Sequence, residues 1–549
     1  MPPAIPIPPM TPPNPQDAFR AAAAHVSRRR FLTVTGAAAA LAFSVGLPQA
    51  HADEPADPGT VRQEPFTLGV ASGDPTPDGV VLWTRLAPAA FEPDGGMPPV
   101  PFLVHWEIAH DEGFRRIARR GRELAHPEFH HTVHAEADGL APGRPYYYRF
   151  RLGRWTSPVG RTSTAPPQHA RNPSMRFGVI ACQNYPGGYY TAFKHLANED
   201  LDAVFHLGDW IYEGAVSSTG GSRAYPAGTL PDVFNHETVT LEDYRLRYAL
   251  YRSDADLRAA QAAHPWILTW DDHEVENNYA GAVSQDNQPP EEFLVRRAAA
   301  YRAYWENQPL RRPQRPRGAD LRLYRRLHYG TLAQFDVLDG RQYRTDQAYG
   351  GNWAPPGPDA DDPARTMLGE RQEHWLADGW RDSRARWNVV PQQVVLAERR
   401  SEPIEAYNVS MDAWDGYTAA RTRFLDAAEA AGVDNLVVLT GDVHVHYAMD
   451  VKRDYADPAA PAVASEIVAT SISSGGNGAE RPANYDRLTQ ANPHMRFYDG
   501  RRGYVTVALD REQCRADFRV VPHITTEGAP IATAASYAIE AGRPGLHRV

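Results

Sequence analysis

Lysine and cysteine are both scarce in this chain of 549 residues. Lys194 and Lys452 are its only lysines, whereas arginine is abundant, and we attribute this bias to genome composition rather than to a phosphate-binding surface. Of the two cysteines, Cys182 ends an apolar run and Cys514 follows a polar one. We therefore interpret Cys182 as a metal ligand and Cys514 as a surface residue. A disulfide between them is the alternative in an exported protein.

Long hydrophobic runs and an excess of positive charge are also missing. No stretch approaches the roughly 18 consecutive apolar residues that form a membrane-spanning helix. The net charge of −10 argues against a broad nucleic-acid-binding surface. The N-terminus instead places Arg28 and Arg29 before a short Ala-rich run that ends in small residues near Ala52. This pattern favours a twin-arginine signal peptide over residues 1–52 and export by that machinery, and the run is too short for the alternative, a membrane anchor.

The mature chain divides into two regions by its pattern of apolar residues. A polar linker is expected at residues 53–63, followed by a small all-β domain of the fibronectin or immunoglobulin type at residues 64–165. Its predicted strands cover residues 80–85, 102–108, 132–135 and 146–150. The run from Leu140 to Tyr148 is typical of a corner at which a tyrosine binds back to the backbone.

From residue 172 to the C-terminus, strand-like and helix-like segments alternate, which predicts a large α/β layered domain. The predicted helices cover residues 190–198, 241–263 and 291–307. The predicted strands cover residues 175–181, 203–207, 266–270, 333–338, 387–390 and 436–440.

The motif G-D-x-x-Y follows the strand predicted at residues 203–207 and contains Asp209 and Tyr212. Open α/β sheets place their ligands at the carboxyl ends of strands. A carboxylate there can bridge two cations, and a phenolate suits a hard, highly charged ion such as Fe(III) better than Zn(II). Taken alone, the motif fits a buried Asp at a turn and a Tyr in the core almost as well.

Three further polar groups follow other predicted strands. Cys182 follows the first strand of the domain, D-D-H-E at 271–274 follows the third, and G-D-V-H-V-H at 441–446 follows the strand at 436–440. Because buried carboxylates need partners, four such groups are hard to explain by packing. Together they indicate the site of a metal-assisted hydrolase.

At this point the chain resembles the alkaline phosphatase D (PhoD-like) family of the calcineurin-like metallophosphoesterase superfamily, over nearly the whole mature chain. The fold this implies is a layered β-sandwich flanked by helices. The runs that carry the resemblance are G-D-W-I-Y-E at 208–213, W-D-D-H-E-V-E-N-N-Y at 270–279, L-D-G-R-Q-Y-R at 338–344, W-D-G-Y at 414–417, G-D-V-H at 441–444 and T-S-I-S-S-G-G at 470–476.

The resemblance implies a role for each candidate residue. One Fe(III) ion is expected to bind the side chains of four residues: Cys182, Asp209, Tyr212 and His444. Ca(II) shares the bridging Asp209 and takes the carboxylates of Asp272 and Asp442, with Asn277 or Asn278 as a further ligand. His273 is either an acid beside the leaving oxygen or an orienting residue, and Arg341 is a candidate phosphate clamp.

Two departures separate the chain from the wider superfamily. The usual D-x-H opening is replaced by Ala181-Cys182-Gln183, and the usual G-H-x-H reads Gly441-Asp442-Val443-His444. Purple acid phosphatases also combine a β-domain with G-D-x-x-Y, and these departures count against them.

The expected function is therefore a secreted, monomeric phosphoesterase that hydrolyses phosphate mono- or diesters. Metals bind the phosphoryl oxygens and present the attacking oxygen in such enzymes. Two alternatives stay open: a phospholipase D-type phosphodiesterase on the same scaffold, and a non-catalytic cell-surface binding protein with structural metals. The sequence leaves the substrate open among monoesters, diesters, phospholipids and teichoic acid.

Overall fold

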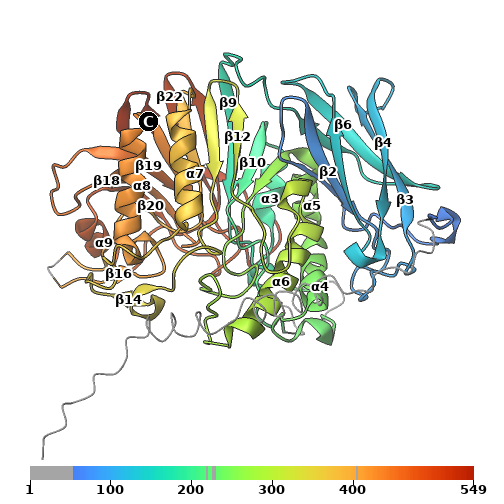
Figure 1. Cartoon of the computed structure of the whole chain (residues 1–549), viewed down its shortest axis with the longest axis horizontal. Coiled ribbons are helices and arrows are strands. Elements are labelled where there is room, and N and C mark those ends of the chain that lie inside the picture. Colours follow the sequence, from blue (N-terminus) through green and yellow to red (C-terminus); the bar gives the residue numbers. More distant parts are fainter. Residues whose placement is uncertain (1–53, 218–220, 226–229, 404–405) are drawn as a thin grey trace, which may run out of the picture.

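The structure is a computed structural model that describes residues 54–217, 221–225, 230–403 and 406–549. The predicted signal peptide lies outside these described residues. Figure 1 shows two β-sheets at the centre, helices on their outer faces, and a lobe of β-strands at the right of the view. This is the layered α/β architecture with an N-terminal β-domain that the sequence predicts, so the expected fold class is confirmed.

The first sheet has ten strands in the order β24-β23-β22-β21-β9-β10-β11-β1-β2-β5. Its centre, β9, β10 and β11, is parallel and matches three predicted strands. The bounds are β1 Val70–Gly73, β2 Gly79–Arg85, β5 Thr132–Asp138, β9 Ser174–Ile180, β10 Ala203–His206, β11 Pro265–Leu268, β21 Arg502–Asp510, β22 Gln513–Val521, β23 Ala532–Glu540 and β24 Arg543–Arg548.

The second sheet has seven strands in the order β12-β13-β15-β17-β19-β18-β20. Strands β13, β15, β17 and β19 run parallel to one another. The bounds are β12 Arg325–Tyr329, β13 Ala333–Val337, β15 Trp387–Pro391, β17 Leu436–Thr440, β18 His446–Lys452, β19 Ala462–Val468 and β20 Met495–Asp499. A separate two-stranded sheet pairs β14 (Trp353–Ala354) with β16 (Val409–Ser410).

The two large sheets bury a shared core between them. Phe177 of β9, Phe205 of β10 and Phe335 of β13 meet there, with ring centroids 4.7–5.6 Å apart. Further apolar clusters cover the outer faces, because α3–α6 pack on the first sheet and α7 and α8 on the second. The helix bounds are α3 Thr191–Leu196, α4 Leu241–Arg252, α5 Ala255–Ala263, α6 Pro290–Asn307, α7 Glu370–Arg381, α8 Thr418–Ala430 and α9 Tyr485–Ala491.

The helix predicted over residues 241–263 is two helices, α4 and α5. The side chain of Asp254 accepts a hydrogen bond from the backbone N–H of Leu257 and caps the start of α5. Thr240 and Asp243 form a capping box at the start of α4. An Asp N-cap satisfies the free backbone donors at the start of a new helix. The chain can therefore change direction at Asp254, although the helical pattern of apolar residues continues through it.

The N-terminal β-sandwich shares one of its two sheets with the large domain. One layer consists of β3 (Phe102–Ala109), β4 (Ile117–Ala125), β6 (Pro145–Leu152), β7 (Trp155–Thr156) and β8 (Gly160–Ser163). The opposite layer is β1-β2-β5, the edge of the ten-stranded sheet, so the sandwich is not a free-standing unit. The predicted linker also contributes to it, because Val61 is buried in the same core.

The tyrosine corner expected in this lobe is confirmed. The phenol oxygen of Tyr146 accepts a hydrogen bond from the backbone N–H of Ala141 at 2.9 Å and donates one to the Ala141 carbonyl at 3.2 Å. This pair of bonds closes the turn before β6 and fixes how the strand enters the sheet.

The parallel strands of the two sheets end at a common rim. An isolated parallel bridge between Ala181 and Ser471 joins the segment after β9 to the segment after β19. Because the carboxyl ends of parallel strands meet at one edge, the loops that carry the predicted site residues are brought together there.

Candidate metal centre

Five candidate residues at this rim have a left-handed backbone. The φ angles are 58° at Cys182, 57° at Asp209, 56° at Asn278, 64° at Asp442 and 57° at His444. Residues other than glycine rarely adopt this conformation, and such residues cluster at ligand sites where the surrounding structure holds them. The turns after β9, β10 and β17 are thus shaped to bring side chains together rather than to connect elements by the shortest path.

The first cluster joins Cys182, Asp209, Tyr212 and His444. The possible ligand atoms of Cys182, Asp209 and His444 all lie within 4.8 Å of one another. The phenol oxygen of Tyr212 donates to Asp209 Oδ2 at 2.9 Å and lies 3.2 Å from His444 Nε2. Residues from three different strand ends, 262 positions apart at most, therefore converge on one point.

The electrostatics of this cluster suit a bound cation. Burial and the neighbouring Asp209 carboxylate raise the pKa of the Cys182 thiol and of the Tyr212 phenol well above their usual values. Burial lowers the pKa of His444 to about 4, so its imidazole is neutral and able to bind a metal. Asp209 Oδ1 is buried without a hydrogen-bond partner, which leaves one oxygen free for a ligand.

The second cluster contains Asp209, Asp272 and His273, again within 4.8 Å of one another. Asp272 accepts backbone hydrogen bonds from His273 at 2.9 Å and from Asn278 at 2.6 Å. Although burial opposes ionisation, Arg341 and His273 together lower the pKa of Asp272. Asp272 is therefore held as a carboxylate, the form that binds a hard divalent ion.

His273 is positioned by a carboxylate and by an aromatic ring. Its Nδ1 lies 2.6 Å from Glu213 Oε2, and its ring centroid lies 4.2 Å from that of Tyr212. Burial opposes protonation, but Asp209, Asp272 and Glu213 raise the pKa of His273 well above its usual value. The side chain is 20% exposed, so the imidazole both holds a proton and reaches the open side of the cluster.

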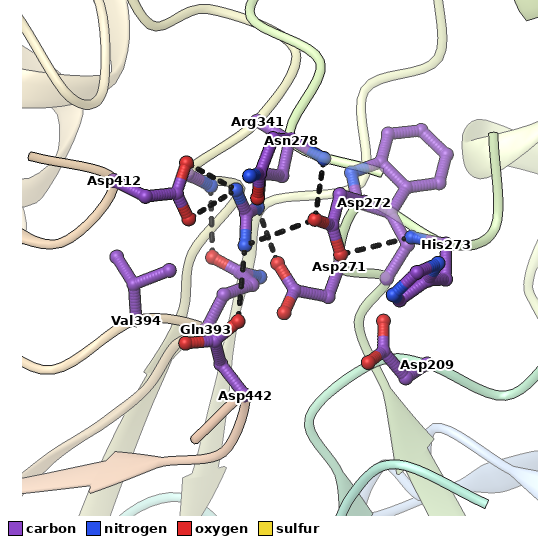
Figure 2. Close-up of polar contacts among 12 residues, drawn as sticks. Asp209, Asp271, Asp272, His273, Asn278, Arg341, Gln393, Val394, Asp412 and Asp442 are labelled. Atoms are coloured by element: carbon purple, nitrogen blue, oxygen red, sulfur yellow. Dashed lines mark hydrogen bonds and ion pairs between the residues drawn. The ribbon is translucent and has the colours of Figure 1, made fainter. Parts of the chain in front are cut away.

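Arg341 is enclosed by carboxylates rather than open to a substrate (Figure 2). Its side chain is 0% exposed. Nε donates to Asp271, Nη1 lies 2.9 Å from Asp412 Oδ2, and Nη2 lies 3.4 Å from Asp442 Oδ1. All the directions in which the guanidinium donates are used inside the protein. The expected role as a phosphate clamp is therefore wrong for this geometry, and Arg341 instead positions the carboxylates.

The two asparagines of the D-D-H-E-V-E-N-N run face different partners. The amide of Asn277 donates to Gln285 Oε1 at 2.5 Å, on the exposed side of the loop. Asn278 lies beside Arg341 and Asp272 in Figure 2, and its backbone N–H binds Asp272. Of the two, Asn278 has the position that suits a ligand next to Asp272.

Comparison with known proteins gives the chain its family. The family profile of PhoD-like phosphatases matches residues 177–518, and the profile of their N-terminal domain matches residues 51–166. The chain belongs to the PhoD-like phosphatase family. It is 47% identical to alkaline phosphatase D of Bacillus subtilis (strain 168) over 527 residues, which are 95% of this chain and 89% of the relative. With the solved structure described as "Structure of PhoD" it shares a TM-score of 0.85 and 48% identity, over 89% of this chain and 93% of that one.

This PhoD-like phosphatase is therefore a phosphoric ester hydrolase, and the alternative of a non-catalytic binding protein is set aside. One carboxylate holds the runs at 208–213 and 270–279 together. The carboxylate of Glu274 accepts the backbone N–H groups of Asp209, Trp210 and Asp271 at 2.6–3.0 Å, and so ties the two loops to each other.

Sequence reasoning gave no role to several residues of the phosphatase site. Glu213 and Ser474 lie in the runs at 208–213 and 470–476, and they support His273 and Tyr212; the Ser474 hydroxyl lies 2.6 Å from the Tyr212 phenol. Asp412 has no motif of its own, yet it accepts hydrogen bonds from Arg341, Arg344 and Gln347. These partners lie 65 to 71 positions away in sequence, so only the folded chain brings them together.

The second cysteine was predicted wrongly. Cys514 is 1% exposed on β22, in the core between the two large sheets, and both cysteines are free. The polar residues before it form the turn into β22, and the alternation along that strand then points Cys514 inward. Cys182 is likewise buried, but at the rim beside Asp209.

Proposed function

We propose that this phosphatase is an exported enzyme that hydrolyses phosphate mono- or diesters at a centre of Fe(III) and Ca(II). The convergence of the Cys182, Asp209 and His444 ligand atoms within 4.8 Å, with the Tyr212 phenol in contact with two of them, is the observation that carries the proposal. A thiolate, a phenolate, a carboxylate and an imidazole supply three negative charges, which suits a trivalent ion better than Zn(II).

The calcium position in this proposal uses Asp209, Asp272 and Asp442, with Asn278 in preference to Asn277. Carboxylate and amide oxygens are the ligands that Ca(II) prefers. Asp271 Oδ2 is buried and has no hydrogen-bond partner, so this side of the cluster also has an oxygen that needs a cation or a proton. Arg341 keeps the surrounding carboxylates apart and in place.

In the proposed mechanism, side chains of the protein orient the imidazole of His273 and transfer the proton. Bound metals would supply positive charge for the phosphoryl oxygens and a water of lowered pKa. His273, oriented by Glu213, holds a proton at the open side of the cluster and is placed to give it to the leaving oxygen. The neighbouring ring of Tyr212, tilted by 32° against the imidazole with ring centroids 4.2 Å apart, limits the rotation of that imidazole.

Quantifying metals in the purified protein tests this proposal. We expect about one iron and one or more calcium ions per chain. A calcium chelator should abolish hydrolysis of p-nitrophenyl phosphate and bis-p-nitrophenyl phosphate, and added calcium should restore it. Two zinc ions per chain would overturn the assignment of Cys182, Tyr212 and Asp442. A substrate panel that includes phospholipids and glycerol-phosphate polymers separates the phospholipase D-type alternative from the others.

Export rests on the sequence, because the signal region is outside the described residues. None of the described helices has the length and hydropathy of a membrane span. We propose export through the twin-arginine pathway, which carries folded proteins and fits an enzyme that receives its metals before transport. The expected monomer stays a prediction for size-exclusion chromatography.

A further inference from the structure

Arg502 is the first residue of β21 and lies at the rim that carries the proposed iron ligands. Strand β21 runs antiparallel to β9, with Val505 opposite Val179. The same register, continued by three residues, puts Arg502 level with Cys182. Arg502 is 4% exposed, so its guanidinium lies inside the protein. The first sheet thus brings a buried cation from the C-terminal part of the chain to the position of a candidate metal ligand.

The guanidinium of Arg502 holds the turn that carries His444. Its Nη1 donates to the backbone carbonyl of His444 and to the hydroxyl of Ser471, each at 2.6 Å, and its Nη2 donates to the carbonyl of Gly500 at 2.6 Å. The φ of 57° at His444 is a strained conformation for a residue other than glycine, and it persists only where neighbouring groups hold it. The hydroxyl of Thr470 donates to the same His444 carbonyl at 2.9 Å. Because the imidazole is attached to this turn, these two donors determine where the ring of His444 lies.

The same guanidinium is connected to Tyr212 through two buried serines. The Ser471 hydroxyl, which accepts a hydrogen bond from Arg502, donates one to the backbone carbonyl of Ser474 at 2.8 Å. The Ser474 hydroxyl lies 2.6 Å from the phenol oxygen of Tyr212 and 3.0 Å from the carbonyl oxygen of Cys182. In a chain of buried hydrogen bonds, each member fixes the position of the next. The run at 470–476 therefore links Arg502 to the Tyr212 and Cys182 segments as well as to His444.

Arg502 carries a buried positive charge that no carboxylate of its own compensates. It forms no ion pair with the residues that the structure describes, whereas the neighbouring Arg501 is paired with Asp499 at 2.5 Å. A guanidinium stays protonated in proteins, and a buried charge is costly unless an opposite charge lies nearby. In the proposed centre, the thiolate of Cys182 and the phenolate of Tyr212 are anions on the segments that Arg502 holds. They are placed to compensate its charge, as it compensates theirs.

We propose that Arg502 is a positioning residue for the iron ligands: it fixes the His444 turn and the run at 470–476, and its charge balances the anionic ligands. The inference rests on the proposed function and deepens it. Arg502 acts through other residues, because its surroundings enclose it. A Cβ atom at Gly478 would lie 2.5 Å from its Nη2, so glycine lets the chain pass over the guanidinium. The calcium side has a different buried arginine, Arg341, which binds Asp271 and Asp412. Loss of Arg502 should therefore affect iron far more than calcium.

The test compares Arg502→Met with the neighbouring Arg501→Met in the full-length protein. Loss of a residue that orients metal ligands weakens metal binding by about 10- to 100-fold, so the dissociation constant for iron should rise by that factor in Arg502→Met. The reduction potential of the bound iron should fall, because removal of a nearby positive charge disfavours the more electron-rich Fe(II). The dissociation constant for calcium should change less than about threefold. Arg501 is paired with Asp499, so Arg501→Met should leave the iron constant and the potential unchanged.

Two milder variants keep the test decisive if Arg502→Met does not fold. Arg502→Lys keeps the charge but not the fork, so it should retain the potential while binding iron more weakly than the wild type. Ser471→Ala removes one acceptor of Arg502 and should also weaken iron binding at an unchanged potential. Unchanged iron constants in these variants, or equal losses of iron and calcium, would overturn the inference alone. A wild-type protein without iron and without phosphoesterase activity would overturn the proposed function, and the inference with it.

Discussion

Arg341→Met separates the two roles that the sequence and the structure give to this arginine. The structure places a fully buried guanidinium among carboxylates, with direct hydrogen bonds to Asp271 and Asp412. Removing one partner of a buried ion pair costs about 3–5 kcal/mol, because the other charge is left without compensation. Asp412 keeps Arg344 and Gln347, whereas Asp271 loses the partner of its Oδ1. We therefore expect metal-free Arg341→Met to lose about 4 kcal/mol of unfolding free energy at pH 7.5, mostly through Asp271.

Urea denaturation of the metal-free protein, followed by tryptophan fluorescence and by circular dichroism, measures this loss. Arg341→Lys keeps a charge, but its three donors sit on one nitrogen and cannot reproduce the planar fork with which Arg341 reaches Asp271, Asp412 and Asp442, so an intermediate loss is expected. Arg381→Met is the matched control, because that arginine is 63% exposed and its one ion pair among the described residues is with Asp378; its loss should be below about 0.5 kcal/mol. A loss below about 1 kcal/mol in Arg341→Met, together with a raised KM in the loaded enzyme, would refute this reasoning and restore the phosphate clamp.

The remaining predictions concern iron binding, export and acid stability. Tyr212→Phe keeps the ring but removes the phenol oxygen, so it should bleach or shift the visible band of a phenolate–Fe(III) centre and lower the iron content; an unchanged spectrum with full iron would exclude Tyr212 as a ligand. Replacing Arg28 and Arg29 by Lys should leave precursor in the cytoplasm, and normal export of that variant would exclude the twin-arginine route. Burial lowers the pKa of His134 to about 4, while its Nε2 lies 2.9 Å from the carbonyls of Trp305 and Gln308. The unfolded chain therefore binds a proton at His134 near pH 6.5, whereas the native state binds it only near pH 4, so the unfolding free energy falls as the pH drops from 6.5 to 4. Urea titrations at pH 7.5 and pH 5 should show that His134→Gln loses about 2 kcal/mol less unfolding free energy over this interval than the wild type. Equal losses in the two proteins would contradict the assignment.

Much of the fold and part of the candidate site could be predicted because their signals are local. Apolar runs such as those at β10 and β17 predict buried strands, and the polar residues that follow these runs indicate where the strands end. Asp209, Asp272 and His444 were candidates on this ground alone. The corner at Tyr146 was equally visible, since its bonding partner Ala141 lies five positions away. Within such short spans, the residue order restricts the backbone to few conformations.

The tertiary structure alone decided what depends on distant partners. Asp412 belongs to the site because it binds Arg341, which lies 71 positions away in the sequence. Asp412 and Asp271 enclose the guanidinium of Arg341, which the sequence analysis expected to bind phosphate. Cys514 is buried because β22 alternates within a sheet whose neighbours lie elsewhere in the chain. Sequence patterns indicate which side chains become buried when the chain folds. Which buried charges then pair with one another depends on which loops the two sheets bring to their common rim.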